Sequence, residues 1–211
     1  MSTKKLTILG KSDATITMIL DNLESNQYFP KIKVINNLNE EIIKEFNNNK
    51  FEIVITDSFE ESNEYILGVF TVKSKNGIIN KFEIPIEKFL NIYHQSCQIS
   101  STTKIGYGCM FNSFVSIASH SNIGNFVSIN RHSSIGHHTI IDDFVTINPN
   151  CGIAGNIYIG KNTQIGIGTN IINGVKIGKN TIIGAGSLVT KDIPDNVVAY
   201  GNPCKIIREN G

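Results

Sequence analysis

The sequence predicts a small α/β unit over residues 1–92, followed by a prism of short parallel strands over residues 93–211. Two observations support this division. From Ile99 to Val189 an apolar residue returns every six positions without a slip. In the first third of the chain, apolar runs with strand spacing alternate with runs of helical spacing. The repeat spans nearly half of the chain and therefore dominates the fold class.

The six-residue period fits neither an α-helix nor a hairpin sheet. Three units, each one strand and one corner, close an 18-residue coil whose repeated residue points inward. A Gly after that residue suits a corner that needs a close backbone approach or a positive φ. Five coils stacked at about 4.8 Å give a prism roughly 24 Å tall. The repeated positions are Ile99, Ile105, Phe111, Ile117, Ile123, Ile129, Ile135, Ile141, Ile147, Ile153, Ile159, Ile165, Ile171, Ile177, Ile183 and Val189.

The first 92 residues alternate between the two kinds of spacing. The expected strands are 5–9, 31–35, 51–55 and 65–70, and the expected helices are 14–23, 39–46 and 73–82. The order strand, helix, strand, helix, strand predicts a small parallel sheet of the Rossmann-like βαβαβ type.

Sheets of this type bind ligands at the carboxyl ends of their strands, typically at the first strand-to-helix turn. Here that turn is Gly10-Lys11-Ser12-Asp13. It lacks the second and third glycines of GxGxxG, so a dinucleotide site is not supported. Gly10, Lys11 and Ser12 are candidates to hold a phosphate through backbone N–H groups and an ammonium. The alternative is an ordinary turn with Asp13 as the N-cap of the helix.

Composition narrows the function further. Nineteen basic and 18 acidic residues give a net charge of +1 without a basic stripe, so nucleic acid is not an expected partner. No apolar run resembles a signal peptide or reaches membrane length, which predicts a cytosolic protein without membrane insertion. The cysteines lack metal-site spacing, and the first three precede a repeat position by two, as small core residues would. They are Cys97, Cys109, Cys151 and Cys204.

The hexapeptide Ile-Gly-x-x-small-x resembles the signature of the left-handed parallel β-helix acyltransferases. The stretch that starts at Ile183-Gly-Ala-Gly-Ser and ends in Gly201-Asn-Pro-Cys-Lys resembles the closing signature of their acetyl-CoA-dependent members. A small βαβ domain before the β-helix is typical of the sugar-nucleotide N-acetyltransferases and sialic acid O-acetyltransferases. The resemblance implies a left-handed helix with a C-terminal tail, a homotrimer, and acetyl-CoA as co-substrate without a metal.

The stretch from Ser134 to Gly155 resembles the catalytic segment of the bacillosamine-type N-acetyltransferases. In that family a His lies two residues after the core Ile, which is His137 here. Histidine suits a base that deprotonates an attacking amine, because its pKa lies near the operating pH. The family has Asp or Glu at the next position, where this chain has His138, and a second His where it has Thr146. Candidates for the missing partner are His138, Asp142 and Asp143, and the alternative is that both histidines are solvated corner residues.

The same resemblance implies the residues that contact coenzyme A. In the family, pantetheine lies in the groove between adjacent prisms, where backbone groups of successive coils meet its amides. The residues implied are Gly155, Ile167 and Ala185 for pantetheine, and Lys191, Lys205 and Arg208 for the phosphates. Gly155 is also implied as the backbone N–H that meets the oxyanion.

Residues 18 positions apart should stack at one corner of the prism. His120 and His138 have this spacing, so they should lie one coil above the other at the same corner. Asn112, Asn130 and Asn148 also have it, and should form an amide ladder between coils. Asn130 is in addition a candidate for binding the sugar substrate.

Two readings compete with acyl transfer. A γ-type carbonic anhydrase would hold zinc through His132, His137 and a third His, but positions 96 and 101 are Ser. A scaffold without catalysis would leave the groove unused. The sequence therefore predicts N-acetylation of a UDP- or dTDP-linked amino-dideoxyhexose in glycan biosynthesis, by direct attack with His137 as base. The alternative within the same machinery is O-acetylation of a sialic-acid-like sugar.

Overall fold

The computed structural model describes residues 5–36 and 50–211, and it divides into two compact units, Met1–Ile92 and Tyr93–Gly211. Within the described residues, no helix has the length and apolar character needed to cross a membrane. The expected helix at 39–46 lies outside the described residues.

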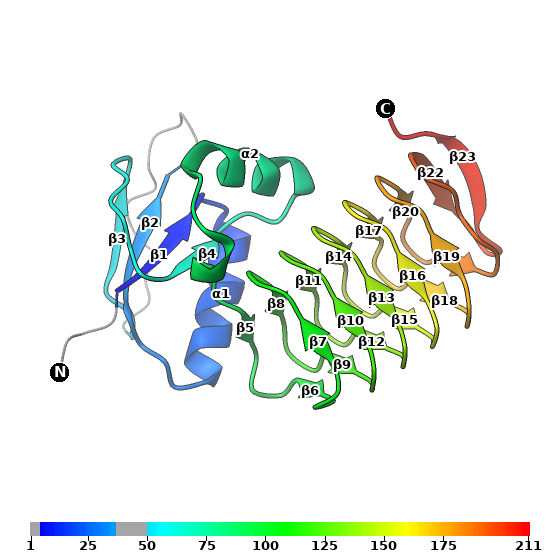
Figure 1. The fold of residues 1–211 in the computed structure, drawn as a ribbon, viewed down its shortest axis with the longest axis horizontal. Coiled ribbons are helices and arrows are strands. Elements are labelled where there is room, and N and C mark those ends of the chain that lie inside the picture. The colour runs from blue at the N-terminus through cyan, green and yellow to red at the C-terminus, as the bar shows by residue number, and fades with distance from the viewer. Residues whose placement is uncertain (1–4, 37–49) are drawn as a thin grey trace. The chain divides into compact units, whose positions relative to one another are not determined.

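The first unit contains a four-stranded sheet in the order β3-β2-β1-β4, with every pairing parallel (Figure 1). Its elements are β1 (Lys5–Leu9), α1 (Asp13–Ser25), β2 (Lys31–Ile35), β3 (Ile53–Thr56), β4 (Tyr65–Leu67), α2 (Val72–Phe82) and the 3₁₀ helix η1 (Ile86–Lys88). Helix α1 buries its apolar stripe, which includes Ile16 and Ile19, both fully buried. A parallel pair joined by a helix follows directly from the alternating sequence pattern.

Strand β4 is shorter than the expected run of 65–70, and the cause is Gly68. Its N–H donates to the carbonyl of Leu9, and its own carbonyl accepts from the N–H of Ser12. A Cβ at Gly68 would lie 2.2 Å from the carbonyl oxygen of Gly10. The chain therefore leaves the strand at this point, where only glycine permits two backbones to approach so closely.

The second unit is a β-solenoid of the left-handed β-helix type, built from two-residue strands that recur every six residues (Figure 1). Its five-stranded face contains β7 (Lys104–Ile105), β10 (Asn122–Ile123), β13 (Ile140–Ile141), β16 (Tyr158–Ile159) and β19 (Lys176–Ile177). Its six-stranded face contains β6 (Gln98–Ile99), β9 (Ser116–Ile117), β12 (Ser134–Ile135), β15 (Gly152–Ile153), β18 (Asn170–Ile171) and β21 (Leu188–Val189). Its eight-stranded face contains β5 (Ile92–Tyr93), β8 (Met110–Phe111), β11 (Ser128–Ile129), β14 (Thr146–Ile147), β17 (Gln164–Ile165), β20 (Ile182–Ile183), β22 (Val197–Tyr200) and β23 (Lys205–Glu209).

The register confirms the 18-residue coil. Ile123 pairs with Ile141 on one face, and Ile135 pairs with Ile153 on another, each 18 positions apart in parallel strands. The repeated residues point inward and form a single core, in which most are at most 2% exposed. Ile99 and Ile105 are only half-buried, because no complete coil precedes theirs.

The glycines after the repeated residue serve close backbone approach and not positive φ. At Gly136 a Cβ would lie 2.4 Å from the carbonyl carbon of Ala154 in the next coil. The left-handed backbone occurs two positions later in each corner, where φ is +56° at both Phe126 and His138. Asn and His tolerate this conformation better than most residues, which explains their frequency at that position.

The regular coil ends after Val189. Ile177 bridges to Ile193, 16 positions on, so the last turn is shorter than the others. Strand β22 then pairs in parallel with β20, and β23 folds back antiparallel to β22. All four cysteines are free thiols, and Cys109 and Cys151 are buried, which agrees with their expected role as small core residues.

Candidate active site

Three edges run along the solenoid, where the chain turns from one face to the next. They are called the histidine edge, the Ile167 edge and the Asp142 edge. The histidine edge follows the six-stranded face and comprises residues 118–120, 136–138, 154–156, 172–174 and 190–192. The Ile167 edge follows the eight-stranded face and comprises 112–114, 130–132, 148–150, 166–168 and 184–186. The Asp142 edge follows the five-stranded face and comprises 106–108, 124–126, 142–144, 160–162 and 178–180.

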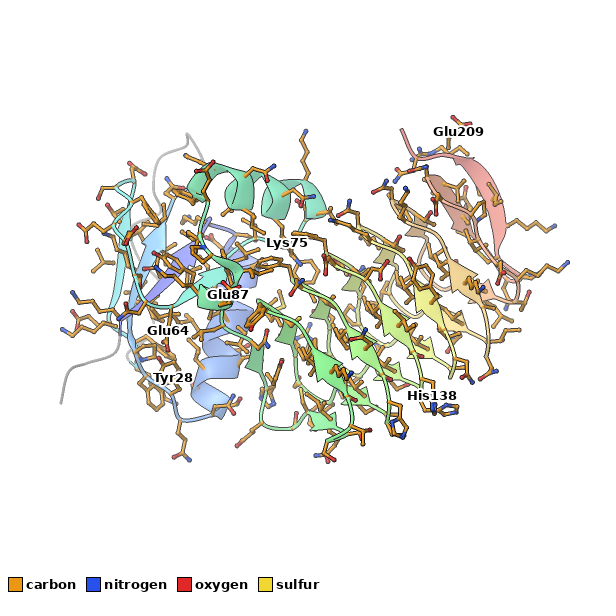
Figure 2. All side chains as sticks on the ribbon, viewed as in Figure 1. Tyr28, Glu64, Lys75, Glu87, His138 and Glu209 are labelled. Atoms are coloured by element: carbon orange, nitrogen blue, oxygen red, sulfur yellow. The ribbon has the colours of Figure 1, made fainter. Side chains whose placement is uncertain are left out.

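His137 and His138 make direct contact on the histidine edge. Their Nδ1 atoms lie 3.0 Å apart, and their rings are nearly perpendicular, at 84°. Both side chains are exposed, and Figure 2 shows His138 projecting outward from the solenoid ribbon. The backbone fixes the pair: the N–H of His138 donates to Ser119, and the carbonyl of His137 accepts from the N–H of Asn156. The backbone of both residues is thus held by hydrogen bonds to the coils on either side.

The ring of His137 rests on Gly155, one coil further along the same edge. A Cβ built on Gly155 would lie 2.7 Å from both Nε2 and Cε1 of His137. Only glycine therefore allows the imidazole to occupy this position. Among the described residues, no acceptor is found for the amide N–H of Gly155, whereas its carbonyl accepts from Gly174. The imidazole of His137 and the backbone of Gly155, a buried residue, are therefore in close contact.

His138 lies one coil above His120 at the same corner, as the 18-residue spacing predicted, and their rings are in tilted contact. The ring centroids are 5.0 Å apart and the planes are inclined by 39°. The N–H of His120 donates to Oγ1 of Thr102, which lies one coil earlier on the same edge. Three histidines therefore form a contiguous group on one edge.

The residues that the resemblance implies for binding coenzyme A lie on more than one edge of the solenoid. Lys191 lies on the histidine edge two coils beyond Gly155, a distance of about 10 Å at ordinary strand spacing. Ile167 and Ala185 lie one coil apart on the Ile167 edge, and Ile167 is 51% exposed. Within one chain the structure does not bring Ile167 or Ala185 to Gly155, because the two edges border opposite sides of the six-stranded face.

Lys205 and Arg208 both lie on strand β23 and are exposed. Nη1 of Arg208 donates to the carbonyl of Glu209, and the rest of its guanidinium is accessible to solvent. These two cations are separate from the histidine pair along the chain and along the solenoid.

The turn Gly10-Lys11-Ser12 belongs to the first unit. Gly10 has φ +89°, and Nζ of Lys11 lies 3.1 Å from the carboxylate of Asp13 with its side chain only 7% exposed. The N–H of Ser12 already donates to Gly68. Helix α1 begins at Asp13, so Ser12 and not Asp13 occupies the N-cap position. The turn thus presents a buried, paired ammonium and not a free one.

The asparagine ladder forms only in part. Nδ2 of Asn112 donates to Oδ1 of Asn130 at 2.8 Å, and Asn130 is buried. Asn148 turns away and donates to the carbonyl of Ile165. A second ladder, which the sequence pattern did not lead us to predict, lies on the Asp142 edge. There Nδ2 of Asn162 donates to Oδ1 of Asn180 at 3.0 Å.

The carboxylates considered as partners of His137 lie on a different edge. Oδ2 of Asp142 accepts from the hydroxyl of Tyr158, and Oδ1 of Asp143 accepts from the backbone and side chain of Asn125. Thr146, where the family has a second His, is buried on the eight-stranded face, and its Oγ1 has no hydrogen-bond partner among the described residues. Within the chain, His138 is the side chain that contacts His137.

The zinc constellation is not assembled in this chain. His132 lies on the Ile167 edge and stacks on Phe114 with ring centroids 4.9 Å apart, away from His137. Among residues 5–36 and 50–211, no group of three or more His, Cys, Asp or Glu side chains has the arrangement of a metal site.

Residues 156–191 match a family model described as "Bacterial transferase hexapeptide (six repeats)". No curated protein matches the sequence. Several solved structures share the fold. A variant of perosamine N-acetyltransferase from Caulobacter crescentus, solved with CoA and GDP-perosamine, is 20% identical, with a TM-score of 0.83 and 99% of each chain covered.

Two further structures have the same architecture. The acetyltransferase domain of PglB from Neisseria gonorrhoeae, with acetyl coenzyme A, is 20% identical, with a TM-score of 0.83 over 98% of this chain and 100% of that one. WeeI from Acinetobacter baumannii is 20% identical, with a TM-score of 0.75 over 97% of this chain and 100% of that one. The predicted resemblance is thus confirmed: the chain carries the hexapeptide repeat of bacterial transferases on the fold of known sugar N-acetyltransferases.

Proposed function

We propose that the protein is an acetyl-CoA-dependent N-acetyltransferase that acts on the amino group of a nucleotide-linked amino-dideoxyhexose. The observation that carries this proposal is the contact between the ring of His137 and Gly155, whose N–H lacks an acceptor among the described residues. A base and an oxyanion donor side by side are the two groups that direct acyl transfer to an amine requires.

In this reaction acetyl-CoA supplies an activated acyl group. His137 accepts at Nε2 the proton that the sugar amine loses as it bonds to the acyl carbon. Gly155 donates its N–H to the acyl oxygen, on which negative charge develops. The attack is direct, without an acyl group on the protein. His137 then returns the proton to the departing sulfur, so the base is regenerated.

The proposed binding site for coenzyme A uses both edges that border the six-stranded face. In a homotrimer the histidine edge of one copy borders the Ile167 edge of the next, and pantetheine lies in the groove between them. Gly155 meets it from one side, and Ile167 and Ala185 meet it from the other. Lys191, Lys205 and Arg208 contact the phosphates, which carry the negative charge. Exposed apolar side chains such as Ile167 suit a groove of this kind.

The first unit binds the nucleotide of the sugar. Its sheet is parallel, and Gly10, with its positive φ, directly follows the carboxyl end of β1, where parallel sheets covered by helices hold phosphates. Gly10, Lys11 and Ser12 are the phosphate contacts in this proposal, in which the ammonium of Lys11 exchanges the carboxylate of Asp13 for the phosphate. The perosamine enzyme of similar fold was solved with a GDP-linked sugar, whereas we expect UDP or dTDP here.

The test is acetyl-CoA turnover, followed by thiol release, with UDP-, dTDP- and GDP-linked 3-amino and 4-amino dideoxysugars. We expect turnover with one of them, and a loss of at least about 100-fold in His137→Ala. His94→Asn is the matched control, since His94 lies outside the proposed site and Asn keeps a side-chain acceptor for the N–H of Ser96.

Three outcomes would contradict parts of this proposal. Full activity in His137→Ala would remove His137 as the base. Turnover only with a sialic-acid-like hydroxyl acceptor would replace N-acetylation by O-acetylation. Turnover with no sugar of either kind would refute the proposed reaction.

A further inference from the structure

We infer that His138 positions His137, by accepting a hydrogen bond from Nδ1–H of His137 while stacking on His120. For its catalytic consequence the inference rests on the proposed function. The tautomer it assigns to His137 exists without substrate and can be measured separately.

The distance between the two rings restricts their protonation. Their Nδ1 atoms are 3.0 Å apart, so a hydrogen bond between them needs a hydrogen on one and a lone pair on the other. If His137 carries the hydrogen at Nδ1, its Nε2 carries a lone pair and can act as a base. If His138 carries it, Nε2 of His137 is protonated and cannot. The first arrangement is the one that leaves Nε2 of His137, the nitrogen beside Gly155, able to act as a base.

The arrangement also fits the proton balance of the reaction. When the amine forms its bond to the acyl carbon, its proton moves to Nε2 of His137 and makes that ring cationic. Nδ1–H stays on His137, and its hydrogen bond to the neutral ring of His138 becomes charge-assisted and stronger. When the bond from the acyl carbon to sulfur breaks, the proton leaves Nε2 for the thiolate. His138 gains and loses no proton.

His138 is itself fixed by its neighbours along the edge. His120 stacks against it from the preceding coil, and the N–H of His138 donates to Ser119 at 3.0 Å. Its left-handed backbone, with φ of +56°, matches that of His120 and places the two side chains in one column along the edge. The next residue in that column is Asn156, which has no charge. A stacked, backbone-anchored ring can orient its partner with little loss of rotamer entropy.

The interaction depends on the lone pair at Nδ1 of His138. The titratable groups that contact His138 are His120 and His137, and none of the three forms an ion pair within the described residues. A hydrogen on Nδ1 of His138 would remove the lone pair that accepts from His137, so the inference requires the hydrogen of His138 to be on Nε2.

Three substitutions separate the roles of stacking and acceptance. His138→Phe keeps a ring against His120 but removes the acceptor, and Phe126 and Phe144 already adopt this backbone conformation. His138→Asn and His138→Asp place an acceptor oxygen as many bonds from Cβ as Nδ1. His94→Asn removes a histidine outside the proposed site, keeps a side-chain acceptor for the N–H of Ser96, and is the matched control.

The first readout is the ¹⁵N NMR spectrum of histidine-labelled full-length protein without substrate. We expect His137 as the Nδ1–H tautomer in wild type, His138→Asn and His138→Asp, and a loss of that preference in His138→Phe. An Nε2–H tautomer in wild type, or an unchanged tautomer in His138→Phe, would overturn the inference. Because no substrate is present, this result stands whether or not the proposed reaction is correct.

The second readout is kcat and KM with the accepted sugar. We expect His138→Phe to lower kcat about 10- to 100-fold, the range found when a group that orients a metal-bound histidine is lost, with KM little changed. His138→Asp and His138→Asn, which keep an acceptor oxygen, should restore most of the rate. Wild-type kcat in His138→Phe, or no recovery in either His138→Asp or His138→Asn, would contradict the inference.

Discussion

The hydroxyl of Tyr158 donates a 2.6 Å hydrogen bond to Oδ2 of Asp142, which links two neighbouring coils of the solenoid. This bond, assisted by burial and the nearby negative charge, raises the pKa of Tyr158 from 10.0 to about 12. The pair lies on the five-stranded face and its edge, away from the histidine pair, and so bears on stability and not on catalysis.

The raised pKa predicts the alkaline behaviour of this contact. The folded state holds the Tyr158 proton more tightly than the unfolded chain does. The stabilisation is therefore complete below pH 10 and is lost as the pH rises through about 12. The difference in absorbance at 295 nm between wild type and Tyr158→Phe should titrate near 12. In Asp142→Asn that titration should move down toward 10, and an unmoved midpoint would show that the hydrogen bond is not the cause.

Gly155→Ala should separate activity from folding. The added Cβ would lie 2.7 Å from the exposed ring of His137, which can rotate away at little cost. We expect a Tm close to wild type but a fall in kcat of about 100-fold, since misplacing a catalytic group by about 1 Å has this effect. In a His137→Ala background the same substitution should change kcat little further. A full additional loss there would locate its effect elsewhere.

Gly136→Ala should instead destabilise the solenoid. Its Cβ would meet the backbone of Ala154, at 2.4 Å from the carbonyl carbon, and backbone cannot move aside as a side chain can. The expected cost is about 1–3 kcal/mol, the usual range for overpacking, measured by denaturant unfolding. Gly152→Ala is the control, because its Cβ would displace only the exposed amide of Asn170. Equal stability of the two variants would contradict the argument.

The loss of stability caused by a substitution in the solenoid should depend on how deeply the replaced side chain is buried. Ile147 is fully buried, so Ile147→Ala should lower the free energy of unfolding by about 2–5 kcal/mol, and Ile147→Val by about 0.5–1.5 kcal/mol. Ile140 precedes another repeat position but is 45% exposed. Ile140→Ala should therefore cost much less. A comparable loss at both sites would mean that the inward orientation is not what stabilises the coil.

The oligomeric state should match a groove shared between copies. Ile167, Ile172 and Phe114 are each more than 40% exposed on the edges of the six-stranded face, a distribution typical of interaction surfaces. We expect a solution mass of three times 23.3 kDa by light scattering, independent of dilution over the assay range. A monomer would separate Ile167 and Ala185 from Gly155 and remove the proposed coenzyme A groove.

Much of the solenoid was predictable because its interactions repeat. The inward positions and the stacking of His120 on His138 both follow from spacing alone. The last coil was not predictable, because a turn shortened to 16 residues between Ile177 and Ile193 leaves no period to detect. In the first unit, the early end of β4 depends on the meeting of Gly68 and Gly10, which are far apart in sequence.

The sequence by itself determined the length of the coil, the residues that point inward and the corner to which each histidine belongs. These properties depend only on counting along a regular chain. The tertiary structure decided how side chains use those corners. It brought the two Nδ1 atoms of His137 and His138 together, put Gly155 beneath the His137 ring, and turned Asn148 out of its ladder toward Ile165. Such contacts depend on side-chain rotamers and on the spacing between coils, and a repeat in sequence specifies neither.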